Sequence, residues 1–139
     1  MSRRYSFAAI AAVVCTLVAA RMPMKWTATL APQGDSKISG MASVTPAGGQ
    51  SSATVSISGG TPNATYPWHV HAGKCGDNGK IVGPATAYTP LKADSYGAAK
   101  VTVTLPYAAP DSGAYYVNIH KSPSEMATIV SCGNLTMAM

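Results

Sequence analysis

The residues in this sequence best suited to chemistry are its three histidines, His69, His71 and His120. His69 and His71 flank Val70, and in a β-strand this alternation puts both imidazoles on one face. His120 ends a second strand-like segment, 114–120, so the three rings would converge if the two strands were neighbours in one sheet. Imidazole nitrogen suits copper and zinc, and at equal geometry Cu(II) is bound more tightly than Zn(II). The pattern therefore predicts a site for one copper ion.

The faces of the two strands indicate which side of the sheet carries the site. Opposite the first histidine pair lie Tyr66, Trp68 and Val70, a larger and more apolar set that should face the core. On the second strand, Tyr116 and Asn118 share the face of the histidine, where either could orient a ring from behind it. We therefore expect all three histidines to point outward, away from the core.

Two further side chains lie close to His120 along the chain. Met126, in the loop that follows, could offer a soft thioether sulfur to Cu(I), although a loop methionine more often serves packing. Lys121 could place a positive charge near the metal, although an exposed lysine needs no special task. Because neutral imidazoles bind the metal, we expect affinity to fall as the pH drops towards the histidine reference pKa of about 6.5 and below.

The elements that must position these residues are predicted to be strands. From Lys25 onward the sequence breaks into short segments with period-two alternation, separated by clusters of Gly, Pro, Asn and Asp. Eight segments qualify: Lys25 to Ala31, Ser36 to Val44, Ser52 to Ser58, Tyr66 to His71, Lys80 to Tyr88, Ala99 to Leu105, Ala114 to His120 and Thr128 to Thr136. The spacing of their turns predicts an all-β sandwich or flattened barrel of antiparallel strands.

Composition limits the classes of protein that remain. The chain has 139 residues, of which 47% are hydrophobic and 11% charged, which is enough apolar material for one sizeable core. We expect one domain over residues 21–139. Its basic residues are scattered singly, with no run that could follow a phosphate backbone, so nucleic acid is not an expected partner.

The first twenty residues, 1–20, are predicted to be a secretion signal. A basic start at 2–5 precedes an apolar run that ends at Ala20. This run is too short for a membrane-spanning helix, so a retained anchor is the weaker alternative. Cys15 within the run allows a second alternative, lipid attachment, which the branched residue before it disfavours. We expect cleavage near Ala20 and export to the periplasm or the extracellular space.

Removal of the signal leaves two cysteines, Cys75 and Cys132. An even pair in an exported chain indicates one disulfide bond, because the compartments outside the cytoplasm are oxidising. Closing a loop of this length would stabilise the fold by about 4 kcal/mol in the chain-entropy model.

Several of these segments resemble those of a known family. The run Trp68–Gly83 resembles the copper-ligand strand and following loop of copper/zinc superoxide dismutases and of the related CHRD domains. Tyr116–His120 is similar to the strand that supplies the third copper histidine, and Val130–Gly133 to the site of the second disulfide cysteine. Lys37–Val44 and Val55–Gly60 resemble the early hairpins of that fold, so the resemblance covers most of the mature chain.

The resemblance implies an eight-stranded antiparallel Greek-key β-sandwich of the superoxide dismutase-like class. It also implies that His69, His71 and His120 bind copper. A disulfide between Cys75 and Cys132 would then pin the loop that follows the first two ligands.

The chain departs from the dismutase pattern in three respects. No histidine is left to bridge copper to zinc or to bind zinc, so no zinc site of the family type is expected. Ile129 stands where the family places the arginine that draws superoxide towards the metal. Only a few residues separate His120 from Thr128, too few for the charged guiding loop of the family. These departures argue against efficient dismutation.

Three functions follow from the sequence, in order of preference. The first is an exported copper-binding protein with a mononuclear three-histidine site, used for copper handling or redox chemistry. The second is a copper-only superoxide dismutase, which converts superoxide to oxygen and hydrogen peroxide as copper alternates between Cu(II) and Cu(I). The third is an extracellular structural module in which metal is incidental. Dependence on copper separates the first two functions from the third.

Overall fold

A computed structural model describes residues 10–18 and 24–138 of the chain. The basic start of the predicted secretion signal and the expected cleavage position near Ala20 lie outside the described residues. Residues 10–18 have no regular secondary structure, and their side chains are exposed. In the described part of the chain, no helix is long and apolar enough to cross a membrane.

Residues 24–138 are built mainly from β-strands. They are β1 (Lys25–Pro32), β2 (Ser39–Ala47), β3 (Gln50–Ser58), β4 (Thr65–Tyr66), β5 (Trp68–Ala72), β6 (Leu91–Lys92), β7 (Ala99–Leu105), β8 (Tyr115–His120) and β9 (Ile129–Ala138). One turn of 3₁₀-helix, η1 (Ala85–Ala87), lies between β5 and β6. The predicted all-β class is confirmed.

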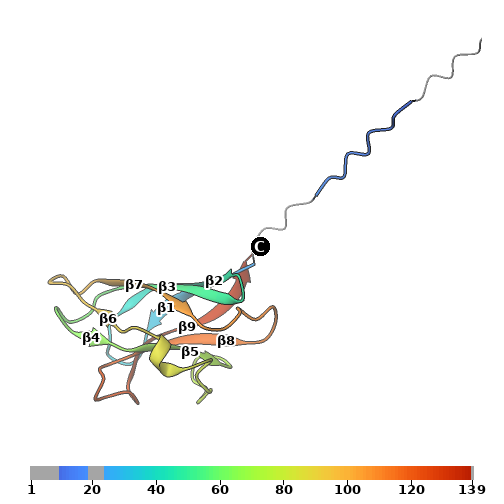
Figure 1. The fold of residues 1–139 in the computed structure, drawn as a ribbon. Helices are drawn as coiled ribbons and strands as arrows, with labels where there is room; N and C mark the ends of the chain where they lie inside the picture. The colour runs from blue at the N-terminus through green and yellow to red at the C-terminus, as the bar shows by residue number, and fades with distance from the viewer. Residues whose placement is uncertain (1–9, 19–23, 139) are drawn as a thin grey trace, which may run out of the picture.

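Seven of the strands form one antiparallel sheet in the order β5-β8-β9-β1-β2-β3-β7, and β4 pairs with β6 in a small second sheet. The large sheet curls, so that β2, β3 and β7 lie above β5 and β8 in Figure 1. After the meander β1-β2-β3, the chain returns through β9 to lie beside β1, which is the strand order of a Greek key. The architecture is therefore the predicted antiparallel sandwich or flattened barrel.

The hydrophobic core fills the inside of this curl. Alternate residues of each strand point inwards because successive side chains of a strand lie on opposite faces of the sheet. The set includes Trp26, Leu30, Val44, Val55, Ile57, Trp68, Val70, Leu105, Val117 and Ile119, all of which are buried. As the sequence predicted, Trp68 and Val70 face the core, so the histidines that alternate with them lie on the other face of β5.

The segment predicted as one strand from Tyr66 to His71 is divided at Pro67. Tyr66 pairs with Leu91 in the small sheet, whereas β5 begins after the proline and pairs with β8. Proline has no N–H to give to a strand ladder, and its carbonyl instead accepts a hydrogen bond from the main-chain N–H of His120 at 2.8 Å. This bond ties the end of β8 to the start of β5.

The strand predicted from Lys80 to Tyr88 is wrong. Only Ile81 makes a bridge, to His71, and the chain then turns at Gly83, which has a φ of +72°, and enters η1. A short apolar run with glycine and proline inside it satisfies the period of a strand without having a partner over its length. The short strand β6 was not predicted from the sequence.

Candidate metal centre

The three histidines come together across two neighbouring strands. His69 and His71 project from β5 and His120 from the end of β8, and the two strands pair with Asn118 opposite His69 and Tyr116 opposite His71. One ring nitrogen from each histidine lies within 4.8 Å of the other two. The strand neighbourhood that the sequence analysis assumed is therefore present, and the three rings form a cluster that could hold one metal ion.

The cluster is buried, which the sequence analysis did not expect. His69, His71 and His120 are 7%, 8% and 5% exposed, although they lie on the face of the sheet that points away from the hydrophobic core. The rings do lie on the predicted face of the sheet, away from the core. They are not exposed to solvent, however, as outward-pointing rings were expected to be. The loops that follow β5 and β8 contact this face and cover it.

Main-chain carbonyls orient two of the rings. The Nδ1 of His71 lies 2.9 Å from the carbonyl oxygen of Gly79, and the Nδ1 of His120 lies 2.6 Å from that of Met126. A carbonyl can only accept a hydrogen bond, so in both rings Nδ1 carries the proton and donates. Each neutral ring then has the lone pair of its Nε2 free for a metal.

The ring nitrogens that could bind a metal differ in whether they have a partner. The Nε2 of His71 is buried and has no hydrogen-bond partner within the described residues. The Nε2 of His120 lies 3.0 Å from the Nδ1 of His69, which must donate to it when no metal is present. A buried polar atom without a partner costs about 1–3 kcal/mol, and a metal bound by these three nitrogens would remove that cost. The donor set therefore fits a metal ion.

Burial also sets the protonation of the cluster. The pKa of His69 is lowered to about 4, mainly by the loss of hydration on burial and to a smaller extent by the neighbouring His120 and His71. Burial likewise lowers the pKa of His120, although its hydrogen bond to Met126 opposes the shift. The neutral, metal-binding form of both rings thus persists below pH 6.5. Competition between protons and metal is expected at lower pH than the sequence analysis assumed.

These shifts predict that the metal-free protein loses stability in mild acid. The pKa of His69 is about 4 in the folded state and 6.5 in the unfolded state, so between these values only the unfolded state takes up the proton. The stabilising contribution is complete above pH 6.5 and is lost as the pH falls to 4, with an upper limit of about 3 kcal/mol. Urea unfolding at a series of pH values measures it. A His69→Gln variant should show a smaller slope, with the part due to His120 remaining, and equal slopes in the two proteins would contradict the prediction.

Tyr116 is the side chain that supports His71. Its ring stacks on the imidazole with 5.1 Å between the ring centroids and 17° between the planes. Its hydroxyl donates to the carbonyl of Asp77 at 2.5 Å and accepts from the main-chain N–H of Gly79 at 3.0 Å. Tyr116 therefore packs on the imidazole of His71 and also fixes the loop whose Gly79 carbonyl orients that imidazole. Asn118, the other orienting residue suggested by the sequence, makes no hydrogen bond to a ring in the described part of the chain.

Replacing Tyr116 by phenylalanine is expected to weaken metal binding about tenfold, a typical loss when a group that orients a ligand is removed. The stacking on His71 is kept, but the loop that carries Gly79 loses both of its bonds to the hydroxyl. Competition with a chelator for Cu(II) measures the change. Tyr96→Phe is the matched control, because Tyr96 is 90% exposed, and it should bind as the unchanged protein does.

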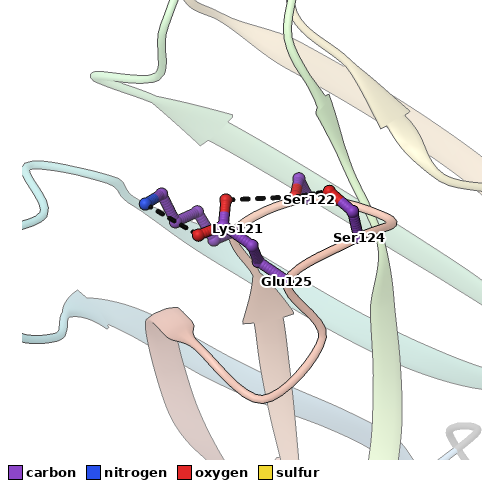
Figure 2. A network of polar contacts seen from close by, with 4 residues as sticks. All are labelled: Lys121, Ser122, Ser124 and Glu125. Carbon is purple, nitrogen blue, oxygen red and sulfur yellow. Dashed lines mark hydrogen bonds and ion pairs between the residues drawn. The ribbon is translucent and has the colours of Figure 1, made fainter.

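The loop after β8 is a compact turn that presents the carbonyl of Met126 to His120. Figure 2 shows the bonds that close it: Lys121 Nζ lies 3.1 Å from Glu125 Oε1, and the hydroxyls of Ser122 and Ser124 lie 3.2 Å apart. The main-chain N–H of Lys121 donates to the carbonyl of Thr128 at 2.9 Å. The ammonium of Lys121 is paired with Glu125, and Lys121 does not line the cavity beside the histidines; a role for its charge near the metal stays a prediction.

Met126 contacts the cluster through its main chain. The residue is 37% exposed and lines the cavity that reaches His71 and His120, and its carbonyl is the group that bonds to His120. A role for the thioether in binding Cu(I) stays a prediction.

Tyr88 is a contact of the cluster that the sequence analysis missed. Its ring lies edge-to-face against His69, with 5.3 Å between the centroids. Its hydroxyl donates to the carbonyl of Val82 at 2.6 Å and lies 2.9 Å from the hydroxyl of Tyr107. Burial raises the pKa of Tyr88. No local pattern could have identified this contact, because it depends on how the segment between β5 and β6 folds back on the sheet.

Cys75 and Cys132 form a disulfide bond across 57 residues of sequence. It joins the loop after β5 to β9, and the main-chain N–H of Cys75 adds a hydrogen bond of 2.8 Å to Asn134 on the same strand. The loop that carries Gly79 is thus fastened to the sheet close to the histidines. The disulfide expected from the sequence is present.

Comparison with protein-family models finds no family that matches this chain, and comparison with curated proteins finds no match either. The superoxide dismutase-like resemblance therefore depends on the sequence segments quoted above.

Proposed function

We propose that this chain is an exported protein that binds one copper ion through His69, His71 and His120 and serves copper handling or redox chemistry. The observation that carries the proposal is the buried Nε2 of His71, which has no hydrogen-bond partner within the described residues. It belongs to a cluster in which one ring nitrogen from each histidine lies within 4.8 Å of the other two. Copper is the metal proposed because imidazoles suit it and because Cu(II) exceeds the other divalent ions of its row in affinity for such ligands.

A copper-only superoxide dismutase is the second candidate. Bound copper would supply a centre that gains and loses one electron. A cavity that reaches His71 and His120 favours this candidate, because a small substrate needs access to the metal. Among the described residues, no lysine or arginine lines that cavity, so the attraction of superoxide that the family obtains from arginine has no counterpart there. We therefore expect slow turnover if this activity is present.

Export is proposed from the apolar run at residues 7–20 and is supported by the disulfide, since such bonds persist in oxidising compartments. Sequencing of the mature protein should find its N-terminus near Arg21. A lipid-modified Cys15 as the first residue would show the other processing route.

Metal analysis of the protein purified from its own compartment tests the central proposal. One copper per chain is the expected result, and a superoxide assay on the copper-loaded protein then separates the two candidates. A triple variant with alanine at all three histidines should bind no copper at the site. If it bound one copper with unchanged affinity, or if the native protein carried no metal and bound copper weakly, the structural-module interpretation would replace this proposal.

A further inference from the structure

Of the three histidines, His69 has the weakest constraint on the orientation of its ring. Main-chain carbonyls hold the rings of His71 and His120. In the described part of the chain, His69 has instead one hydrogen bond, between its Nδ1 and the Nε2 of His120 at 3.0 Å. That bond occupies the lone pair with which His120 would bind a metal, so it cannot persist in the metal-bound site. The torsion that turns an imidazole about its bond to Cβ has broad minima, so His69 needs another support.

Tyr88 offers that support through its ring. The two ring centroids lie 5.3 Å apart and the ring planes are at 82°, which is an edge-to-face contact. The other aromatic rings against His69 in the described residues are those of His71 and His120, which would bind the same metal. Tyr88 is therefore the aromatic contact that can fix His69 from outside the metal site.

The position of Tyr88 is itself fixed. The residue is 4% exposed, and its hydroxyl bonds to the carbonyl of Val82 and to the hydroxyl of Tyr107. Its ring also lies edge-to-face against Trp68, with 5.0 Å between the centroids. The indole N–H of Trp68 donates in turn to the carbonyl of Thr89 at 2.8 Å. A ring held by two hydrogen bonds and two aromatic contacts has little freedom to move aside.

Tyr88 contacts side chains on both faces of β5. Trp68 and His69 are consecutive residues of this strand, so their side chains lie on opposite faces of the sheet. Because β5 is the end strand of the large sheet, a ring that contacts both must lie across the free edge of the strand. Farther along that edge, the main-chain N–H of Val82 donates to the carbonyl of Val70 at 2.9 Å. The segment 82–88 thus covers the edge and brings the tyrosine ring to His69.

We propose that Tyr88 is a positioning residue for His69, whose ring it holds in the orientation that directs a nitrogen towards the other two histidines. This inference rests on the proposed function, because its effect is on a metal bound by these rings. The contact is made by the ring of Tyr88 and does not need the hydroxyl. Phenylalanine should therefore preserve it, whereas an aliphatic side chain would leave the imidazole free to turn. Removal of a group that orients a metal ligand lowers metal affinity by about 10–100-fold.

Copper-loaded variants of the full chain test this role, with chelator competition for the Cu(II) affinity and electron paramagnetic resonance for the ligand geometry. Tyr88→Leu should bind Cu(II) at least about tenfold more weakly and should change the copper hyperfine splitting. Tyr88→Phe should keep the spectrum and an affinity within a few-fold of the unchanged protein. The matched control is Tyr66→Leu, at a tyrosine of the small sheet that is also 4% exposed and whose hydroxyl accepts a hydrogen bond from the main-chain N–H of Thr61. This control should leave both the spectrum and the affinity unchanged.

The outcomes separate this inference from the proposed function. Wild-type affinity and spectrum in Tyr88→Leu would overturn the inference, and so would an equal loss in Tyr88→Phe or in Tyr66→Leu. In these cases copper binding itself would stand. A wild-type protein that binds no copper would instead remove the proposed function, and the inference with it. Circular dichroism checks that each variant is folded, and should Tyr88→Leu fail to fold, Tyr88→Ile takes its place.

Discussion

Replacing His71 by alanine is expected to weaken Cu(II) binding by at least about 100-fold. Loss of a residue that merely orients a metal ligand costs 10–100-fold in affinity, so loss of a ligand should cost no less than the upper figure. His71 is the sharpest choice because its Nε2 has no other partner, whereas its Nδ1 is already bonded to Gly79. Competition with a chelator of known affinity measures the change.

The burial of the cluster adds a condition to this experiment. The removal of His71 leaves the carbonyl of Gly79 without its donor, which costs stability on the order of 1–3 kcal/mol. Circular dichroism and thermal unfolding must therefore show that the variant is folded at the temperature of the assay. Asn78→Ala, a change in the exposed lining of the cavity beside the histidines, is the control and should leave copper affinity unchanged. Affinity within a few-fold of wild type in His71→Ala would show that the metal binds elsewhere.

Removing the disulfide with Cys75→Ala and Cys132→Ala is expected to lower the free energy of unfolding by about 4 kcal/mol, the chain-entropy value for a loop closed over 57 residues. For a domain of this size, that loss lowers the melting temperature by roughly 20 °C. Copper affinity should also fall, because the loop that carries Gly79 is then held to the sheet by fewer contacts.

Urea unfolding of the oxidised protein and of the double variant measures the first effect. The matched control is Cys15→Ser in the full chain, since Cys15 is an exposed free cysteine that forms no bridge, and its stability should not change. A double variant as stable as the control would mean that the disulfide does not restrict the unfolded chain as the entropy model assumes.

Much of the architecture can be predicted from local sequence patterns. Side chains of a strand alternate between two faces, so the pattern of Trp68, His69, Val70 and His71 by itself assigns one pair to the core and the other pair to the opposite face. The same rule located most of the long strands to within a few residues. The rule gave a wrong strand over Lys80 to Tyr88. Alternation indicates which side chains would share a face, but it does not indicate whether a neighbouring strand is present to pair with the segment.

The three histidines and the two cysteines were also identified from the sequence, because their side-chain chemistry is unusual and their number is small. The tertiary structure alone decided what surrounds them: burial beneath two loops, and the support of His71 and His120 by the carbonyls of Gly79 and Met126. Every residue has a carbonyl, so the sequence carries no mark of which ones will bond to a ring. That choice depends on loops whose path is set by contacts far apart in the chain, including the link from Cys75 to β9.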